Sequence, residues 1–116
     1  MKTPTRHSDI LTLPMHQLID KINNKEISSQ ELLEIQLEHI SKHNPSINSV
    51  VTIDEELALK KTIEADNALT KGESWGPLHG LPITLKDAYE VKGIPSTGGS
   101  SKWKTHIPAK NAVVAD

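Results

Sequence analysis

The chain has 116 residues, which is long enough for a single domain. Its net charge of −2 excludes binding to nucleic acid or acidic membranes through charge alone. The absence of cysteine excludes a disulfide framework and a thiol nucleophile, and no apolar stretch approaches the ~18–20 residues needed to cross a bilayer. Hydrophobic residues make up only 35% of the chain, which predicts a lean core, and a cytoplasmic location is expected because no apolar segment follows the basic N-terminus.

Residues 1–10 are predicted to be a flexible N-terminus, and the first helix follows them. Thr12 is a suitable N-cap, because its hydroxyl can accept a hydrogen bond from the open end of a helix, and Pro14 suits the opening turn. This helix is expected to run to about Asn24.

A second helix is predicted from Ser29 to His43. Ser28 and Glu31 have the spacing of a capping box, in which each side chain accepts a hydrogen bond from the other residue's backbone N–H. The helix should stop before Pro45, because a residue that precedes proline disfavours the helical conformation. Its predicted apolar face consists of Leu33, Leu37 and Ile40.

Two strands and a third helix are predicted farther along. Residues 49–53 are rich in β-branched side chains and flanked by polar residues, which is typical of a strand. Asp54 can cap a helix that runs to Thr70, with Gly72 as its C-terminal stop. Residues 83–88 begin with alternating apolar and polar side chains, the period of a strand. Helices and strands together predict an α/β fold.

Lys86 lies in this alternating segment, between two turns rich in glycine and proline. A sheet covered on both faces would remove its ammonium group from water and favour the neutral form. An unperturbed lysine titrates near ~10.4, so a base at neutral pH needs a pKa lower by about 3 units, or roughly 4 kcal/mol. Lys86 is therefore a candidate general base, and the alternative is a solvated lysine at the end of a strand.

The segments around Lys86 resemble the lysine motif of the amidase signature family, which reads G-P-L-H-G-(I/L)-P-(I/V)-(S/T)-x-K-D and then G-x-(P)-(T/S)-T-x-G-S. In this chain they are Gly76–Asp87 and Gly93–Ser100. The resemblance extends from about Leu11 to the end of the chain and implies the N-terminal helices and first strands of that family's α/β sheet fold. Shorter similar segments are Ser28–Leu32, Asn44–Pro45, Ile47–Thr52, Ala65–Asp66, Ile107–Pro108 and Asn111–Val114.

The resemblance implies a hydrolase of carboxylic amides. In the family, a lysine acts through a bridging serine, held by a cis peptide bond, to activate a second serine that attacks the amide carbonyl. The lysine of that pattern falls on Lys86, and both serines belong to a Ser/Gly-rich segment that the family places well after it. Gly98-Gly-Ser-Ser101 is the tail of the lysine motif and not that segment, so two of the three catalytic groups are missing.

Residues 11–116 are accordingly predicted to be the N-terminal part of a single amidase domain, truncated before the nucleophile region. The apolar run Ala112–Ala115 ends at Asp116 without a cap or a polar tail, which favours this interpretation. The expected partner is the missing C-terminal portion of the same fold, and the expected ligand of the parent enzyme is a small-molecule amide. No cofactor is expected.

Several other side chains could contribute to the site around Lys86 or bind a metal ion. Asp87 is expected either to alter the basicity of Lys86 or to accept N–H groups in the turn that follows. His79 is assigned to loop packing in preference to proton transfer. His39 and His43 lie four apart on the second helix, but no third ligand accompanies them and no metal site is predicted. The residues expected to support Lys86 by hydrogen bonds and close backbone approach are Thr97, Gly98, Gly99 and Ser100.

Two classes of function remain open. In the first, the parent protein hydrolyses an amide with Lys86 as the proton acceptor, either alone or as one component of a glutamine-dependent tRNA amidotransferase. In the second, the 116-residue chain is a catalytically inactive piece that serves at most as a scaffold or a binding piece.

Overall fold

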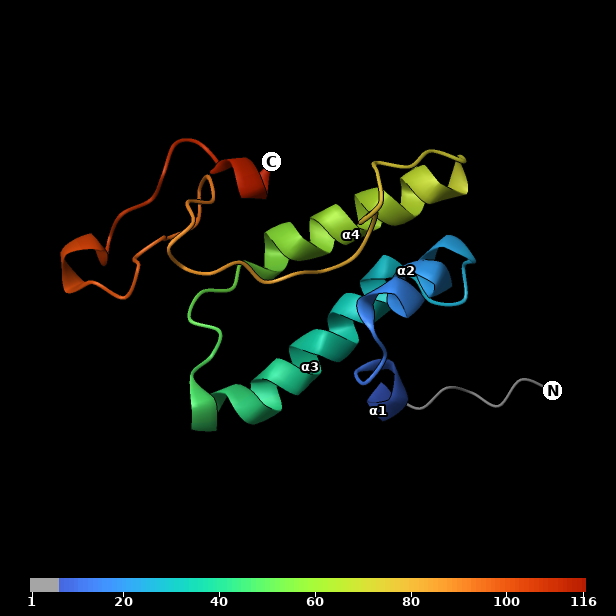
Figure 1. The fold of residues 1–116 in the computed structure, drawn as a ribbon, viewed down its shortest axis with the longest axis horizontal. Coiled ribbons are helices and arrows are strands. Elements are labelled where there is room, and N and C mark those ends of the chain that lie inside the picture. The colour runs from blue at the N-terminus through green and yellow to red at the C-terminus, as the bar shows by residue number, and fades with distance from the viewer. Residues whose placement is uncertain (1–6) are drawn as a thin grey trace. The chain divides into compact units, whose positions relative to one another are not determined.

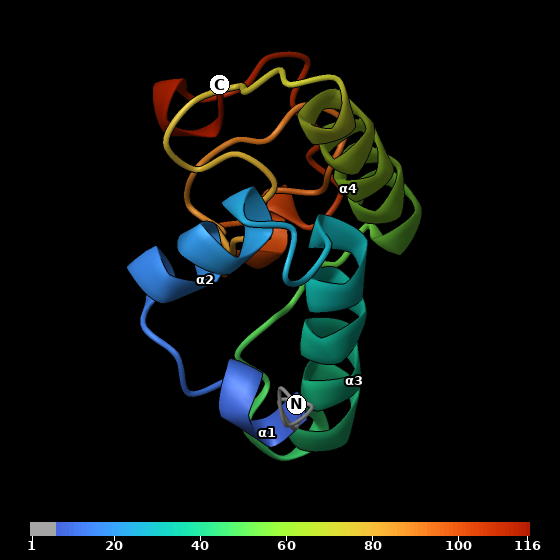
Figure 2. The ribbon, with the colours of Figure 1, turned by 90° about the vertical axis from the view of Figure 1, so that its right-hand side faces the viewer.

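A computed structural model describes residues 7–116 (Figure 1, Figure 2). One compact unit, the helical unit, runs up to Ile47 and resumes from Glu55 to Pro82, and the other, the loop unit, consists of Asn48–Asp54 and Ile83–Asp116. Residues 1–6 of the predicted flexible N-terminus lie outside the described residues. The helices are α1 (His7–Ile10), α2 (Met15–Asn23), α3 (Ser29–Ile47) and α4 (Glu55–Thr70), with two short 3₁₀ helices, η1 (Ser101–Trp103) and η2 (Val113–Ala115).

The predicted α/β fold is wrong, because the described residues form helices and no strand. Residues 49–53 and 83–86 have no regular structure, and Asp87 and Ala88 already belong to a turn. A strand requires hydrogen-bond partners on a neighbouring strand, so the alternation of side chains is not sufficient to form one. In the described part of the chain no such neighbour exists.

Helix α2 begins later than predicted, because Pro14 and not Thr12 is its N-cap residue. The Thr12 hydroxyl instead donates to the carbonyl oxygen of Asp9 at 2.9 Å and closes the turn after α1. Pro14 has the extended backbone that an N-cap position takes, with φ −66° and ψ 152°. The end of the helix, at Asn23, is close to the prediction.

The capping box predicted at the start of α3 is confirmed. The Ser28 N–H donates to the Glu31 carboxylate at 2.8 Å, and the Glu31 N–H donates to the Ser28 hydroxyl at 3.0 Å. The N–H groups of Ser29 and Gln30 donate to the two carboxylate oxygens of Asp66 on α4, at 2.8 and 3.1 Å. The N–H groups that a helix leaves open at its start are thereby satisfied, and Asp66 ties α3 to α4.

Helix α3 continues through Pro45 and ends at Ile47, contrary to the prediction that it stops before the proline. Proline lacks an N–H and so removes one hydrogen bond to the preceding turn. Pro45 lies only two residues before the end of α3, so the missing hydrogen bond weakens only the last turn of the helix. Asn48 then takes a positive φ of 47° and terminates the helix.

The core of the helical unit lies where α1 and α2 pack along α3. In both views α2 lies beside the first turns of α3, and α1 lies farther along it (Figure 1, Figure 2). The predicted apolar face of α3 is only partly correct, because Leu33 is buried whereas Leu37 and Ile40 are half-buried. The buried cluster consists of Ile10, Ile22, Leu32 and Ile35. Partly buried side chains that pack against it are Leu11, Leu13, Leu18, Ile27, Leu69 and Leu81.

Helix α4 confirms the prediction for residues 55–70, and Gly72 follows it with a φ of +79°. Its buried side chains include Ala65 and Ala68, which are small enough for α3 to pack closely against it. None of the helices in the described part of the chain is both long and apolar enough to cross a membrane.

Gly80 lies directly against the start of α3. A Cβ atom added there would lie 2.1 Å from the Ser29 hydroxyl oxygen, and the φ of +71° disfavours any side chain. Ser29 is fully buried, and its hydroxyl has no hydrogen-bond partner among the described residues. Glycine therefore lets the loop that follows α4 adopt this backbone and lie against Ser29 without displacing its hydroxyl.

We expect Asp66→Ala to lower the free energy of unfolding by about 1–2 kcal/mol, because two N–H groups at the start of α3 lose their acceptor. Urea denaturation followed by far-UV circular dichroism measures this loss. Asn67→Ala, at an exposed neighbour on the same helix, is the control and should change the free energy by less than about 0.5 kcal/mol. Equal losses in the two variants would contradict the capping role of Asp66.

Candidate functional site

Lys86 lies at the end of an irregular segment, directly before a turn. Its carbonyl oxygen accepts a hydrogen bond from the Tyr89 N–H at 2.9 Å, which closes that turn. The Lys86 side chain is exposed, so within residues 7–116 no sheet covers its ammonium group as the strand prediction required. The hydrogen bonds that fix the backbone next to Lys86 are made by the following residue, Asp87.

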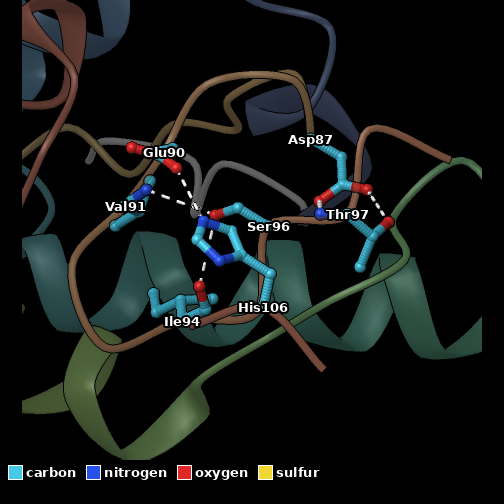
Figure 3. Close-up of polar contacts among 7 residues, drawn as sticks. All are labelled: Asp87, Glu90, Val91, Ile94, Ser96, Thr97 and His106. Carbon is cyan, nitrogen blue, oxygen red and sulfur yellow. Dashed lines mark hydrogen bonds and ion pairs between the residues drawn. The ribbon is translucent and has the colours of Figure 1, made fainter. Parts of the chain in front are cut away.

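Asp87 binds Thr97 through both carboxylate oxygens (Figure 3). Oδ1 accepts a hydrogen bond from the Thr97 N–H at 3.0 Å, and Oδ2 accepts one from the Thr97 hydroxyl. The carbonyl oxygen of Asp87 also accepts the Gly98 N–H at 3.2 Å. This set of bonds, which we call the Asp87–Thr97 clasp, brings two of the predicted supporting residues next to the neighbour of Lys86.

The turn after Thr97 is built from two glycines with positive φ, Gly98 at 57° and Gly99 at 73°. The Gly99 N–H donates to the Thr97 hydroxyl oxygen at 3.2 Å, and the Ser100 N–H donates to the Thr97 carbonyl at 3.0 Å. The Ser100 hydroxyl accepts the Lys102 N–H at 3.3 Å and caps η1. The structure thus joins Gly99 to the clasp through Thr97, whereas the side chain of Ser100 serves the 3₁₀ helix.

A second group of polar contacts, which no motif in the sequence predicted, stabilises the loop unit (Figure 3). The buried Ser96 hydroxyl accepts the Val91 N–H at 3.3 Å and donates to the Ile94 carbonyl at 3.2 Å, while the Ser96 N–H donates to the His106 carbonyl at 3.0 Å. His106 Nε2 lies 2.6 Å from a Glu90 carboxylate oxygen. Histidine and glutamate are 16 positions apart, and no local pattern in one sequence signals such a pair.

His79 is part of the loop packing of the helical unit, as predicted. Its ring is buried, with Nδ1 accepting the Trp75 N–H at 2.9 Å and Nε2 lying 2.9 Å from the Ala65 carbonyl oxygen. The carbonyl can only accept, so Nε2 carries the proton and the ring is neutral. Because both nitrogens are bonded to the backbone, this histidine has no nitrogen left to take a proton from a substrate.

His39 and His43 lie side by side on α3, with ring centroids 4.4 Å apart and both side chains exposed. Over residues 7–116, no group of three or more histidine, cysteine, aspartate or glutamate side chains is arranged to hold a metal ion. The pair therefore offers at most two ligands, fewer than the three protein ligands of a catalytic zinc site.

The clasp lowers the pKa of the Asp87 carboxyl below its ordinary value of 3.8. The hydrogen bond from the Thr97 hydroxyl has the largest effect, followed by that from the Thr97 N–H. Burial opposes these bonds, and the N–H groups of Gly99 and Gly98 add smaller lowering effects. Asp87 is therefore ionised at neutral pH and acts as an acceptor only.

The comparisons with known proteins point to one family. The family model described as Amidase matches residues 31–116. A glutamyl-tRNA(Gln) amidotransferase subunit of Caldanaerobacter subterraneus subsp. tengcongensis is 34% identical over 108 residues, which are 93% of this chain and 22% of the relative. The acylamidase of Rhodococcus erythropolis is 34% identical over 100 residues, which are 86% of this chain and 21% of the relative. The chain thus spans about a fifth of the length of these curated relatives.

We expect the Asp87–Thr97 clasp to open in acid. Because folding lowers the pKa of Asp87, the ionised carboxyl stabilises the folded loop unit fully above the unfolded-state value, and this stabilisation is lost as the pH falls through the folded-state value. An NMR titration of the Asp87 carboxyl carbon should have its midpoint below 3.8. Thr97→Val should raise that midpoint, and Thr105→Val, at an exposed threonine of the same unit, should not. An unchanged midpoint in Thr97→Val would show that Thr97 does not lower the pKa.

Proposed function

This chain belongs to the amidase family, and on that premise we propose that it is the N-terminal part of an enzyme that hydrolyses carboxylic amides, with Lys86 as its general base. The proposal rests on one observation above all: Lys86 occupies the lysine position of the Gly76–Asp87 motif, inside the matched residues 31–116. The Asp87–Thr97 clasp supports it, because it gives the neighbour of an otherwise exposed lysine a defined position.

In the proposed reaction the neutral Lys86 amine takes a proton from a bridging serine, which in turn takes the proton of a nucleophilic serine. The nucleophilic oxygen bonds to the amide carbonyl carbon, and the C–N bond breaks as the nitrogen takes the proton that Lys86 returns through the bridging serine. Water then cleaves the resulting ester and releases the carboxylic acid. This chain supplies the base, and the two serines come from a segment that its motif does not include.

The surface of the loop unit supports a further part of the proposal, a partner that completes the fold. Apart from Pro108, the aliphatic side chains that are buried in the described residues all belong to the helical unit. In the loop unit, Ile83 and Ile107 are 59% and 58% exposed, and Val113 is 94% exposed. We propose that the remaining portion of an amidase domain covers these side chains.

A second candidate function comes from the relatives. The chain is 34% identical both to an acylamidase and to a component of glutamyl-tRNA(Gln) amidotransferase, so identity favours neither. The alternative to a free-standing amidase is therefore the N-terminal part of one component of a glutamine-dependent tRNA amidotransferase. The 116 residues by themselves are then an inactive scaffold in either case.

We expect the isolated chain to hydrolyse neither aliphatic nor aryl amides above background, and to remain unlabelled by serine-directed fluorophosphonates. A lysine base without a nucleophile cannot form an acyl-enzyme. Mass spectrometry of the treated chain measures labelling, with the acylamidase of Rhodococcus erythropolis as the positive control. Stoichiometric labelling of any serine in the chain would refute this expectation.

The role of Lys86 can be tested in a hybrid protein that carries residues 1–116 followed by the remaining sequence of the acylamidase. Lys86→Ala should lower kcat by roughly 10²–10⁴-fold with little change in KM, because the loss falls on proton transfer in the transition state. Lys86→Arg should be nearly as damaging, since a guanidinium keeps its proton near neutral pH.

Lys104→Ala, at an exposed lysine of the same unit, is the matched control and should keep the activity of the hybrid. A thermal unfolding transition shared by all variants shows that the substitutions leave the fold intact. Lys86→Arg with most of the original kcat would reduce Lys86 to a structural cation.

A further inference from the structure

We propose that Asp87 is a positioning residue for Lys86, and that it locks the lysine backbone and the Thr97–Gly99 turn into one rigid site. The inference rests on the proposed function of Lys86 and assigns to its neighbour the task of holding it in place. Asp87 itself takes no proton from the substrate.

The direction of each hydrogen bond in the clasp follows from the chemistry of the groups. The ionised Asp87 carboxylate can only accept, so the Thr97 hydroxyl donates its proton to it. The hydroxyl oxygen is then free to accept the Gly99 N–H, at 3.2 Å. These bonds form a chain from Gly99 through Thr97 to Asp87, and each bond in such a chain polarises the next.

The clasp restricts the backbone of Lys86 because it holds the residue that follows it, Asp87. The Asp87 carboxylate is bonded to Thr97, and its carbonyl oxygen is bonded to the Gly98 N–H. The peptide between Lys86 and Asp87 is planar, and its carbonyl oxygen receives the Tyr89 N–H at 2.9 Å. The backbone orientation of Lys86 is therefore defined, and only the rotamers of its side chain remain free.

The glycines of the turn leave its surroundings open. A Cβ atom added at Gly98 or Gly99 would meet no heavy atom of the described residues within 4 Å. Their positive φ, and not crowding, accounts for glycine at both positions. The turn thus combines a hydrogen-bonded backbone with open space directly beside its two glycines.

Asparagine is the most specific test at position 87, because it keeps the shape of aspartate and changes only the charge and hydrogen bonding of the side chain. It offers one acceptor oxygen and an amide donor, so it can satisfy the Thr97 N–H or the Thr97 hydroxyl proton but not both. The amide could donate to the second lone pair of the Thr97 hydroxyl oxygen, but the hydroxyl proton then loses the ionised acceptor that it has in Asp87. Asp87→Asn therefore replaces a charge-assisted hydrogen bond of the clasp by a weaker neutral one while it preserves side-chain volume.

The first experiment measures backbone ¹⁵N order parameters in the 116-residue chain. We expect values of about 0.8 or higher at Lys86 and Thr97–Gly99 in the wild type, and values below about 0.6 in Asp87→Asn and Thr97→Val. Thr97→Ser keeps the hydroxyl and should retain the wild-type values. Glu90→Gln weakens the contact with His106 outside the clasp and is the control. Low values in the wild type, or unchanged values in both disruptive variants, would overturn the proposal.

The second experiment measures kinetics in the hybrid protein with the acylamidase sequence. Asp87→Asn should lower kcat by roughly 10²-fold while KM changes by less than about threefold, because a displaced base impairs proton transfer more than binding. Thr97→Val should act in the same direction, and Thr97→Ser should restore most of kcat. A substitution that merely destabilised the fold would lower the unfolding temperature, but kcat would not fall in Thr97→Val and recover in Thr97→Ser.

The two proposals can fail separately. If Lys86→Ala abolishes activity while Asp87→Asn leaves kcat unchanged, the positioning role is refuted and the general base stands. If Lys86→Ala keeps full activity, the proposed function is refuted, and with it the role of Asp87 in catalysis. The order parameters then decide whether the clasp still orders the chain.

Discussion

The buried start of α3 is the constraint on which the helical unit depends. Ser29 is fully buried, so its N–H group needs a partner within the protein, and Asp66 of α4 accepts this N–H and that of the half-buried Gln30. The adjacent carbonyl, of Ala65, lies 2.9 Å from Nε2 of the buried His79. One turn of α4 therefore holds both the helix start and the loop that returns to it, where Gly80 packs on Ser29.

The two units are stabilised by different forces. The helical unit buries an aliphatic cluster, whereas in the loop unit the buried residues are Ser96 and Pro108. A typical hydrogen bond contributes about 0.5–1.5 kcal/mol net to the free energy of unfolding. A unit that is stabilised mainly by a few such bonds is therefore easily destabilised when one of them is lost. Its order then depends on each polar pair, among them Asp87 with Thr97 and Glu90 with His106.

Local signals in the sequence predicted the structure well where the determining contacts are also local. The capping box of Ser28 and Glu31 and the stop of α4 at Gly72 involve residues within one turn of each other, and both are present. Thr12 failed as a predicted cap because its hydroxyl binds the preceding turn, a competing local bond that propensity alone does not rank.

Long-range pairing explains the other differences. The segment that contains Lys86 has the alternation of a strand, yet a strand forms only when a neighbour supplies hydrogen bonds. Lys86 itself could be singled out from the motif around it. Its link to Thr97 could not, because the carboxylate of Asp87 has many possible partners in a sequence and only folding selects one of them.

The contact of Gly80 with Ser29 makes the evolution of these two positions interdependent. An alanine Cβ atom at position 80 would lie 2.1 Å from the Ser29 hydroxyl oxygen and 3.3 Å from the Ser29 Cβ atom, so alanine there requires the serine side chain to move or to be replaced by a smaller one. Even then the left-handed backbone, with φ of +71°, keeps its penalty, which no change at position 29 relieves. The dependence is asymmetric: position 29 can become smaller while glycine stays at 80, whereas a side chain at position 80 meets both the Ser29 side chain and the backbone penalty. Across descendants of this sequence, glycine at position 80 should therefore persist longer than serine at position 29.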